Sequence, residues 1–524
     1  MHWTPEAEAA LAKVPPFVRV MARKSVEDHA RRNGMADVTL SLVREVQQQM
    51  MGHSPAETPS PADGTTGYNV GANRRESMHL TDDRRYLAND TDDPLHEAFD
   101  RKLAVHAMAR NEQIPPDGLS SSWASAIAGE HEGGRQRAIY VHVPFCRGHC
   151  LFCGFYQNAC QPERMRRYVD TLLLEIAHTA SAPFARRAPF QAVYFGGGTP
   201  TALAAEDIRR MVSGIKEHFP LANDCEMTLE GRFCDFGPEK IDAALECGIN
   251  RFSLGVQTFD TFVRKSIGRL ESGETLMETL AYLRDLGRAS IIIDLIYGLP
   301  GQSMATWEKD IGTYIDLGID GCDLYQLNIF TGGPLDKAVR KGALPTPAAL
   351  KEQADYFVRG VDLMREHHQR RLSITHWAQS TRERSLYNAL SRGRSECLPF
   401  GAGGGGWIGH RRFFLESNLE EYAARVAAGE KPISMGFEGT ERDLLYRDIA
   451  YQIELGYCDL SSLSERYHME LTAGIGPVLE QWENIGLVQF RGNCLYLTRA
   501  GEFWAVNLAQ IIIDALQLCP KTTE

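Results

Sequence analysis

Three cysteines stand close together in the segment YVHVPFCRGHCLFCGFY, which spans residues 140–156. Cys146, Cys150 and Cys153 follow the order C-x3-C-x2-C in a loop directly after a predicted strand. Three thiolates on one short loop can bind three irons of a cubane [4Fe-4S] cluster and leave the fourth iron open to an outside ligand. The spacing therefore predicts a metal centre that can react.

Two alternatives remain for these cysteines. A zinc site usually takes a fourth protein ligand and paired CxxC-type knuckles, and three buried thiols could also fall together by coincidence. The spacing, the preceding strand and the aromatic Phe152 just before the last cysteine favour the cluster. Most of the remaining cysteines are expected to be buried and inert. They are Cys160, Cys225, Cys234, Cys247, Cys322, Cys397, Cys458, Cys494 and Cys519.

With this motif the chain resembles the radical S-adenosylmethionine (radical SAM) superfamily, in which the open iron binds the amino and carboxylate groups of the cofactor. The resemblance implies reductive cleavage of the sulfonium to a 5'-deoxyadenosyl radical, while the protein orients the cofactor and excludes water. It also implies a low-potential electron donor such as a flavodoxin or a ferredoxin.

Further motifs follow in the order that the superfamily shows. The glycines of YFGGGTPT would let the backbone approach the cofactor's amine, a role compatible with a tight strand-to-helix turn. A guanidinium matches a carboxylate in two hydrogen bonds, and a carboxylate among β-branched residues needs a partner such as a ribose diol. The resemblance assigns to the cofactor Tyr140, Phe152, Gly196, Gly197, Gly198, Thr199, Glu230, Gln257, Arg269 and Asp294.

The amino-acid sequences of these motifs resemble those of the coproporphyrinogen III dehydrogenase-like branch across residues 136–335. That branch contains the anaerobic dehydrogenase, a heme chaperone and heme-degrading radical methyltransferases, the anaerobilin synthases. The dehydrogenase carries a further cysteine where this chain has Phe155, so the coproporphyrinogen III dehydrogenase activity is the less favoured interpretation. Segments 92–107, 375–388 and 399–414 resemble the heme-degrading enzymes. The resemblance implies anaerobic methylation and opening of the porphyrin to a linear tetrapyrrole with release of iron; a heme chaperone is the alternative.

A heme substrate would need cations for its propionates and groups that ligate iron or move protons. His376, His410 and Arg384 are the predicted catalytic residues. Arg382, Arg411 and Arg412 join Arg384 as candidate partners of the propionates, although each of these residues alone is more often structural. One or two molecules of S-adenosylmethionine would bind, the second as methyl donor.

Short β-branched runs alternating with helix-length amphipathic stretches predict the scaffold that positions these residues. Alternation of this kind is typical of an α/β fold with a parallel sheet, and functional groups after the strands are typical of barrel enzymes. Six units are too few for a closed eight-fold barrel, so we expect an open, partial (β/α)6 barrel. The expected strands are 138–143, 192–195, 226–229, 251–256, 291–296 and 323–329.

Both ends of the chain predict additional modules. Helix signals in 1–51 resemble the C-terminal domain of a light-independent protochlorophyllide reductase subunit, with a generic three-helix appendage as the alternative. Residues 52–80 have the composition of a flexible linker. Residues 81–135 would extend the catalytic domain, 136–345 form the barrel and 346–434 lie near the substrate. Two helices and a hairpin turning at Gly492-Asn493 predict a winged-helix-like domain at 435–524 that covers the barrel.

The overall composition excludes several function classes. The chain has 524 residues, of which 43% are hydrophobic and 24% charged, as expected for a multidomain globular protein. Its formal net charge of -12 argues against a nucleic-acid partner. The N-terminus has no signal-peptide pattern, and no apolar stretch is long enough to span a bilayer. We therefore expect a cytoplasmic protein without a membrane partner.

Overall fold

The structure is a computed structural model of the whole chain. It describes residues 1–12, 23, 26–27, 29–31, 35, 37–44, 87–103, 106–109, 111–129, 135–234 and 236–518. The predicted linker, much of the helical module predicted at 1–51, and Cys519 lie outside these residues. Among the described residues, no helix is both long and apolar enough to cross a bilayer.

Six parallel strands, neighbours in chain order, form the centre of a 13-stranded sheet. Their β-branched and aromatic residues are almost entirely buried, because helices cover one face of the sheet and other segments fill part of the opposite face. All six predicted strands are present. They are β4 (Arg137–Val143), β7 (Phe190–Gly197), β8 (Leu221–Gly231), β9 (Arg251–Gln257), β10 (Ser290–Tyr297) and β11 (Gly321–Gln326). However, β8 begins five residues earlier than predicted and β11 ends three residues earlier.

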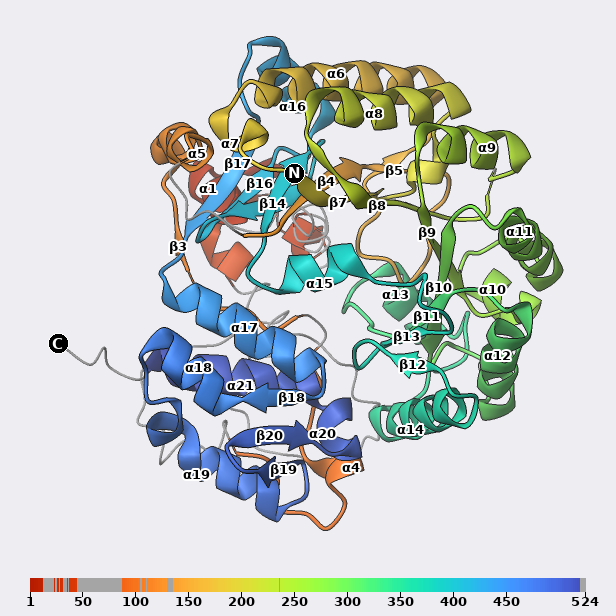
Figure 1. Cartoon of the computed structure of the whole chain (residues 1–524), viewed down its shortest axis with the longest axis vertical. Coiled ribbons are helices and arrows are strands. Elements are labelled where there is room, and N and C mark those ends of the chain that lie inside the picture. The colour runs from red at the N-terminus through yellow and green to blue at the C-terminus, as the bar shows by residue number, and fades with distance from the viewer. Residues whose placement is uncertain are drawn as a thin grey trace.

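Amphipathic helices form an arc around the outside of these strands (Figure 1). They are α6 (Pro162–Ala180), α8 (Ala205–His218), α9 (Pro238–Cys247), α11 (Gly273–Leu286), α12 (Met304–Leu317) and α14 (Leu350–Glu366). In α8, for example, Ile208, Met211 and Ile215 recur at helical spacing and are fully buried. Ser272 caps the start of α11, and Gly287 ends it in the left-handed conformation.

The sheet extends beyond the predicted barrel at both edges. β14 (Glu396–Phe400) pairs in parallel with β4, and this seventh parallel strand was not predicted. Antiparallel strands follow it: β15 (Gly405–Ile408), β16 (Arg411–Leu415), β17 (Ile433–Glu438) and β3 (Glu112–Gln113). At the other edge, β13 (His376–Ala378) pairs antiparallel with β11, and β12 (Arg370–Arg371) pairs with β13. Among the described residues, the outermost strands β12 and β3 do not pair with each other, and no pairing closes the sheet into a barrel there.

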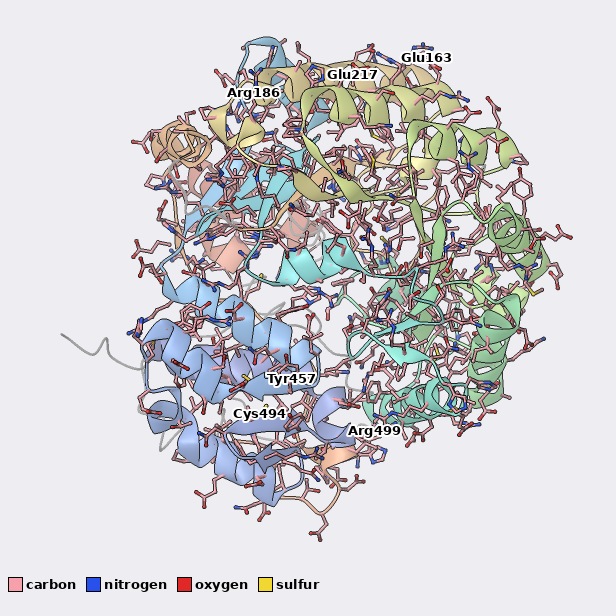
Figure 2. All side chains as sticks on the ribbon, in the orientation of Figure 1. Glu163, Arg186, Glu217, Tyr457, Cys494 and Arg499 are labelled. Carbon is pink, nitrogen blue, oxygen red and sulfur yellow. The ribbon has the colours of Figure 1, made fainter. Side chains whose placement is uncertain are left out.

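The C-terminal elements pack beside the barrel (Figure 1). They are α17 (Arg442–Glu454), β18 (Tyr457–Asp459), α18 (Leu460–Tyr467), α19 (Leu471–Asn484), β19 (Val488–Arg491), β20 (Cys494–Leu497), α20 (Arg499–Phe503) and α21 (Ala505–Leu518). The predicted hairpin is present, but three helices precede it rather than two, and β18, α20 and α21 were not predicted. The hairpin turns at Gly492, whose φ of 62° suits glycine. Arg499 lies where these elements meet the barrel (Figure 2), and its Nη1 is 3.0 Å from Asp362 Oδ1 on α14.

The N-terminal residues form a small core of their own. β1 (His2–Trp3) pairs in parallel with β2 (Asp37–Val38), and α1 (Pro5–Ala12) packs against them. Further on, α4 (Pro94–Glu97) and nearby residues hold the C-terminal elements; Trp504 Nε1 donates to Pro94 O over 2.9 Å. β17 crosses the boundary predicted at 434/435, and the domain divisions stay predictions.

Short elements complete the fold. They are η1 (Pro116–Gly118), α5 (Leu119–Ile127), β5 (Phe145–Cys146), β6 (Asn158–Ala159), α7 (Pro183–Arg186), η2 (Pro200–Ala202), α10 (Thr261–Ser266), α13 (Pro334–Arg340), α15 (Leu386–Arg392) and α16 (Leu419–Ala427).

Candidate active site

The cysteine loop begins at the carboxyl end of β4, the first barrel strand. Cys146 ends β5, which pairs with β6, and its carbonyl accepts from Cys160 N–H over 3.2 Å. Cys153 N–H donates to Cys150 O over 3.0 Å. Leu151 N–H donates to the carbonyl of Ile267, also over 3.0 Å, which ties the loop to the segment after α10. The loop is therefore held at both ends by backbone hydrogen bonds.

All three cysteines of the loop are free thiols. Burial raises the pKa of Cys146, and it raises the pKa of Cys153 to about 11. Two donors oppose this effect: Thr199 Oγ1 lies 3.3 Å from Cys146 Sγ, and Phe155 N–H donates to Cys153 Sγ over 3.3 Å. Hydrogen bonds to sulfur of this kind suit thiolates that bind iron.

The described residues contain no group of three His, Cys, Asp or Glu side chains arranged around a single metal ion. A [4Fe-4S] cubane does not require one, because each thiolate binds a different iron of the cluster. Three free cysteines on one loop, two of them buried, are a donor set that fits such a cluster.

Three arginines lie near the cysteine loop, and two of them, Arg264 and Arg269, are buried. Arg269 donates through Nη1 to Gly255 O over 2.6 Å and lies over the Phe152 ring, 5.9 Å from its centroid. Its Nε is buried and has no hydrogen-bond partner in the described part of the chain, which suits an anionic ligand. Sequence reasoning missed Arg264, which is fully buried, and Arg232, which donates to Gly148 O over 2.9 Å. These positive charges favour the thiolate form of the cysteines.

The glycine run ends β7, next to the cysteine loop, and leaves no room for side chains. A Cβ atom on Gly196 would lie 2.5 Å from Glu230 Oε2, and one on Gly198 would lie 2.6 Å from Phe145 O. Gly197 has a φ of +107°, and its N–H donates to Glu230 Oε2 over 3.2 Å. The run is thus a backbone cradle beside a carboxylate, which is the geometry expected for a polar cofactor.

Glu230 near the end of β8 and Asp294 within β10 carry carboxyl groups that are only partly accessible to solvent. Burial, together with the charge of Asp294, raises the pKa of Glu230 to about 8. Burial and the charge of Asp323 raise the pKa of Asp294. Gln257 has a φ of 66°, unusual for a non-glycine residue, and its Oε1 is buried without a partner in the described residues. An incoming amine or ribose hydroxyl would satisfy such groups.

Tyr140 contacts His142, a histidine that sequence reasoning missed. Its hydroxyl lies 2.9 Å from His142 Nδ1. Burial lowers the pKa of His142 to about 4, so the imidazole is neutral. The His142 ring occupies the space where a Cβ of Gly197 would lie, 2.4 Å from Cε1, and its Nε2 is buried without a partner among the described residues. The available signal was period-2 spacing, which places His142 on the same face of β4 as Tyr140.

His376 does not have a free nitrogen for heme iron. Its Nδ1 lies 2.8 Å from Asp323 Oδ2 and its Nε2 lies 3.1 Å from Glu383 Oε1. Glu383 in turn accepts two hydrogen bonds from Arg251, each 3.0 Å long. Burial alone would lower the pKa of His376, but the two carboxylates raise it to about 9. His376 is therefore a buried imidazolium, and its predicted role as an iron ligand does not fit this geometry.

Arg382 and Arg384 lie at the amino-terminal ends of the barrel strands, opposite the end where a substrate contact was predicted. Arg382 donates to Ala289 O over 2.7 Å, immediately before β10 begins. Arg384 donates to Asp224 Oδ2 over 3.0 Å, near the start of β8. Both partners belong to the amino-terminal ends of parallel strands, whereas the cysteine loop follows the carboxyl end of β4. The substrate contacts predicted for these arginines are therefore not supported.

The second group of predicted heme residues lies on the sheet extension. His410 Nε2 is 3.3 Å from Glu438 Oε1, and Arg411 Nε is 2.9 Å from the same oxygen. Arg411 is therefore already paired, whereas Arg412 donates to Met108 Sδ over 2.9 Å. The catalytic role of His410 stays a prediction.

Comparison with known proteins agrees with this geometry. The Radical SAM superfamily matches residues 140–313, and the Proto-chlorophyllide reductase 57 kD subunit matches residues 3–47. The chain is 38% identical to the anaerobilin synthase of Escherichia coli O157:H7, over 85% of this chain and 97% of that protein. It is 26% identical to the heme chaperone HemW of Bacillus subtilis, over 70% of this chain and 96% of that protein.

Among solved structures, the chain resembles coproporphyrinogen III oxidase from Escherichia coli, a radical SAM enzyme. The TM-score is 0.66 at 23% identity, covering 75% of this chain and 93% of that one, which shows a shared fold. The anaerobilin synthase match is both higher in identity and almost complete over the relative. The chain therefore belongs to the radical SAM superfamily, in the family of anaerobilin synthase.

Proposed function

We propose that this chain is an anaerobilin synthase, a radical SAM methyltransferase that opens heme to a linear tetrapyrrole without oxygen and releases the iron. The observation that carries the proposal is the 38% identity to such an enzyme over 97% of its length. The geometry supports it, because the cysteine loop, the glycine cradle and the carboxyl group of Glu230 gather at the carboxyl ends of parallel strands.

In this proposal Cys146, Cys150 and Cys153 hold a [4Fe-4S] cluster. A cluster with bound S-adenosylmethionine supplies one-electron reductive cleavage of the cofactor's sulfonium. Thr199 and Phe155 N–H stabilise the cluster thiolates through the hydrogen bonds described above. A low-potential donor such as a flavodoxin or a ferredoxin would provide the electron.

Other residues bind and orient the cofactor. The backbone of Gly196, Gly197 and Gly198 admits its polar end. Arg269 Nε, which has no hydrogen-bond partner among the described residues, can donate to its carboxylate. Glu230, with its raised pKa, can hold a proton or accept from an amine. Burial of these groups excludes water and strengthens each polar contact.

The experiment is an anaerobic reaction of the iron-reconstituted protein with heme, S-adenosylmethionine and a strong reductant. We expect the Soret band to disappear in a cofactor-dependent way, with a methylated, iron-free linear tetrapyrrole in the mass spectrum. A stable Soret band alongside release of 5'-deoxyadenosine would contradict heme degradation and favour another substrate or the chaperone alternative.

A matched pair of cysteine variants tests the cluster assignment. The combined change of Cys146, Cys150 and Cys153 to Ala should abolish cluster absorbance and cofactor cleavage. Cys494→Ala is the control, because Cys494 is a free thiol on β20 in the C-terminal elements (Figure 2), where β20 pairs with β18 and β19. Retention of both signals in the triple variant would overturn the assignment.

A further inference from the structure

A row of cross-strand neighbours runs from the barrel interior along the sheet extension. Directly paired residues project to the same face of a sheet, and so do residues two positions apart on one strand. The register therefore places one continuous set of side chains on a single face. The successive pairs are Tyr194 with Tyr140, Tyr140 with Pro399, Cys397 with Trp407, Trp407 with Arg412, and Arg412 with Phe437.

This row lies on the inner face of the sheet. Phe413, adjacent to Arg412, projects to the opposite face, where its ring packs 5.2 Å from that of Trp123 on α5. On the inner side, Tyr387 of α15 stacks on Tyr194 with ring centroids 4.5 Å apart. The row thus begins at the tyrosines beside the cofactor site and continues away from it.

The aromatic residues of the row are incompletely buried. Tyr387 stacks on Tyr140 with ring centroids 6.2 Å apart, whereas Trp407, Phe437 and Phe414 are half-buried further along the sheet. Phe414 lies two residues beyond Arg412, and its ring makes an edge contact with that of Phe437, with centroids 6.2 Å apart. Flat aromatic rings that keep exposed surface on one sheet face suit a flat, apolar ligand.

Two arginines project into this aromatic face. Arg412 donates to Met108 Sδ over 2.9 Å, and its guanidinium lies 4.9 Å from the Phe414 ring centroid. Arg447, from α17, donates to Ser395 O over 3.3 Å and lies 4.8 Å from the Trp407 ring centroid. Within the part of the chain that the structure describes, neither guanidinium forms an ion pair with a carboxylate.

Two neighbouring cations without a counter-ion are costly in this environment. Burial lowers the pKa of both arginines, and the charge of Arg412 helps to bring that of Arg447 to about 10. Arg411, one residue away, has its own carboxylate partner in Glu438. A bound anion would offset the cost of bringing Arg412 and Arg447 together.

We propose that Arg412 and Arg447 form the carboxylate subsite of a tetrapyrrole pocket whose wall includes the half-buried rings of Trp407, Phe414 and Phe437. The inference rests on the proposed function and deepens it by naming where the acidic edge of the substrate binds. A planar macrocycle would lie against these rings, and its carboxylates would accept hydrogen bonds from the two guanidinium groups.

The test is a Soret titration of the full-length reconstituted protein with heme and with heme dimethyl ester, which lacks the carboxylates. Wild type should bind the diacid at least about 10-fold more tightly, as expected for charge-assisted hydrogen bonds. Arg412→Gln and Arg447→Gln should each weaken diacid binding by about 10-fold and leave diester binding unchanged. Lysine at either position should restore part of the preference.

Arg382→Gln and Arg384→Gln are the matched controls, since both arginines lie at the amino-terminal ends of the strands. The diester serves as the folding control for each variant, because a misfolded protein would lose both ligands. Equal affinity of wild type for diacid and diester, or no binding of the diacid, would overturn the inference. Preferential binding of the diacid without its anaerobic consumption would support the subsite and contradict the proposed degradation of heme.

Discussion

Replacing His376 with glutamine removes a positive charge that is held between two buried carboxylates. Asp323 and Glu383 raise the pKa of His376 from 6.5 to about 9 in the folded protein. That difference corresponds to about 3 kcal/mol of stability carried by the imidazolium. Because the pKa is raised in the folded protein, this stability is fully present below about pH 6.5 and is lost as the pH rises through about 9.

We therefore expect His376→Gln to be least stable, relative to wild type, in mild acid. Urea unfolding followed by circular dichroism at about pH 6 and about pH 9.5 measures the difference in unfolding free energy, which should shrink by about 3 kcal/mol at the higher pH. His410→Gln is the control, because His410 is partly exposed, with 40% of its side chain accessible. A difference that does not change with pH would refute the assignment of His376 as a buried imidazolium.

The same variant separates a structural role from iron ligation. Because both ring nitrogens bind carboxylates, His376→Gln should leave the Soret maximum of the heme complex unchanged. A shifted maximum, as expected from the loss of an axial ligand, would show that the histidine leaves its carboxylates and reaches the iron.

Gly197→Ala should weaken binding of S-adenosylmethionine by at least about 10-fold, as measured by equilibrium dialysis. The left-handed backbone costs an L-residue about 1–2 kcal/mol, and the new Cβ would lie 2.4 Å from His142 Cε1. Gly312→Ala on α12 is the control, because a Cβ there meets nothing within 4 Å. It should bind S-adenosylmethionine normally and gain about 0.5–1 kcal/mol of stability. Normal binding of S-adenosylmethionine by Gly197→Ala would refute the role of the glycine run as a cradle for the cofactor. Glu175→Gln should lower the free energy of unfolding in urea by about 3–5 kcal/mol, because it leaves Lys431, whose Nζ lies 2.7 Å from Glu175 Oε1, as an uncompensated buried charge. A decrease below about 1 kcal/mol would contradict the importance of this ion pair.

Local features of the sequence predicted the parts of the site that are contiguous in the chain. The cysteine loop and the glycine run each depend on a few adjacent residues and their backbone conformations. The hairpin turn at Gly492, outside the site, was predicted for the same reason. The strands of the barrel also follow from local patterns, since buried parallel strands are short β-branched runs. Phe155 in place of a cysteine distinguished one branch of the superfamily from another.

The tertiary structure decided which distant segments meet. Glu383 reaches Arg251 across 132 residues, and that long-range pairing is what converts His376 from a candidate ligand into a buried cation. β14 pairs with β4 although the two strands lie more than two hundred residues apart in the chain. Through β14, the next strands β15 and β16 place Trp407 and Arg412 on the inner face. No local pattern encodes such contacts, because they depend on how the whole sheet closes around its core.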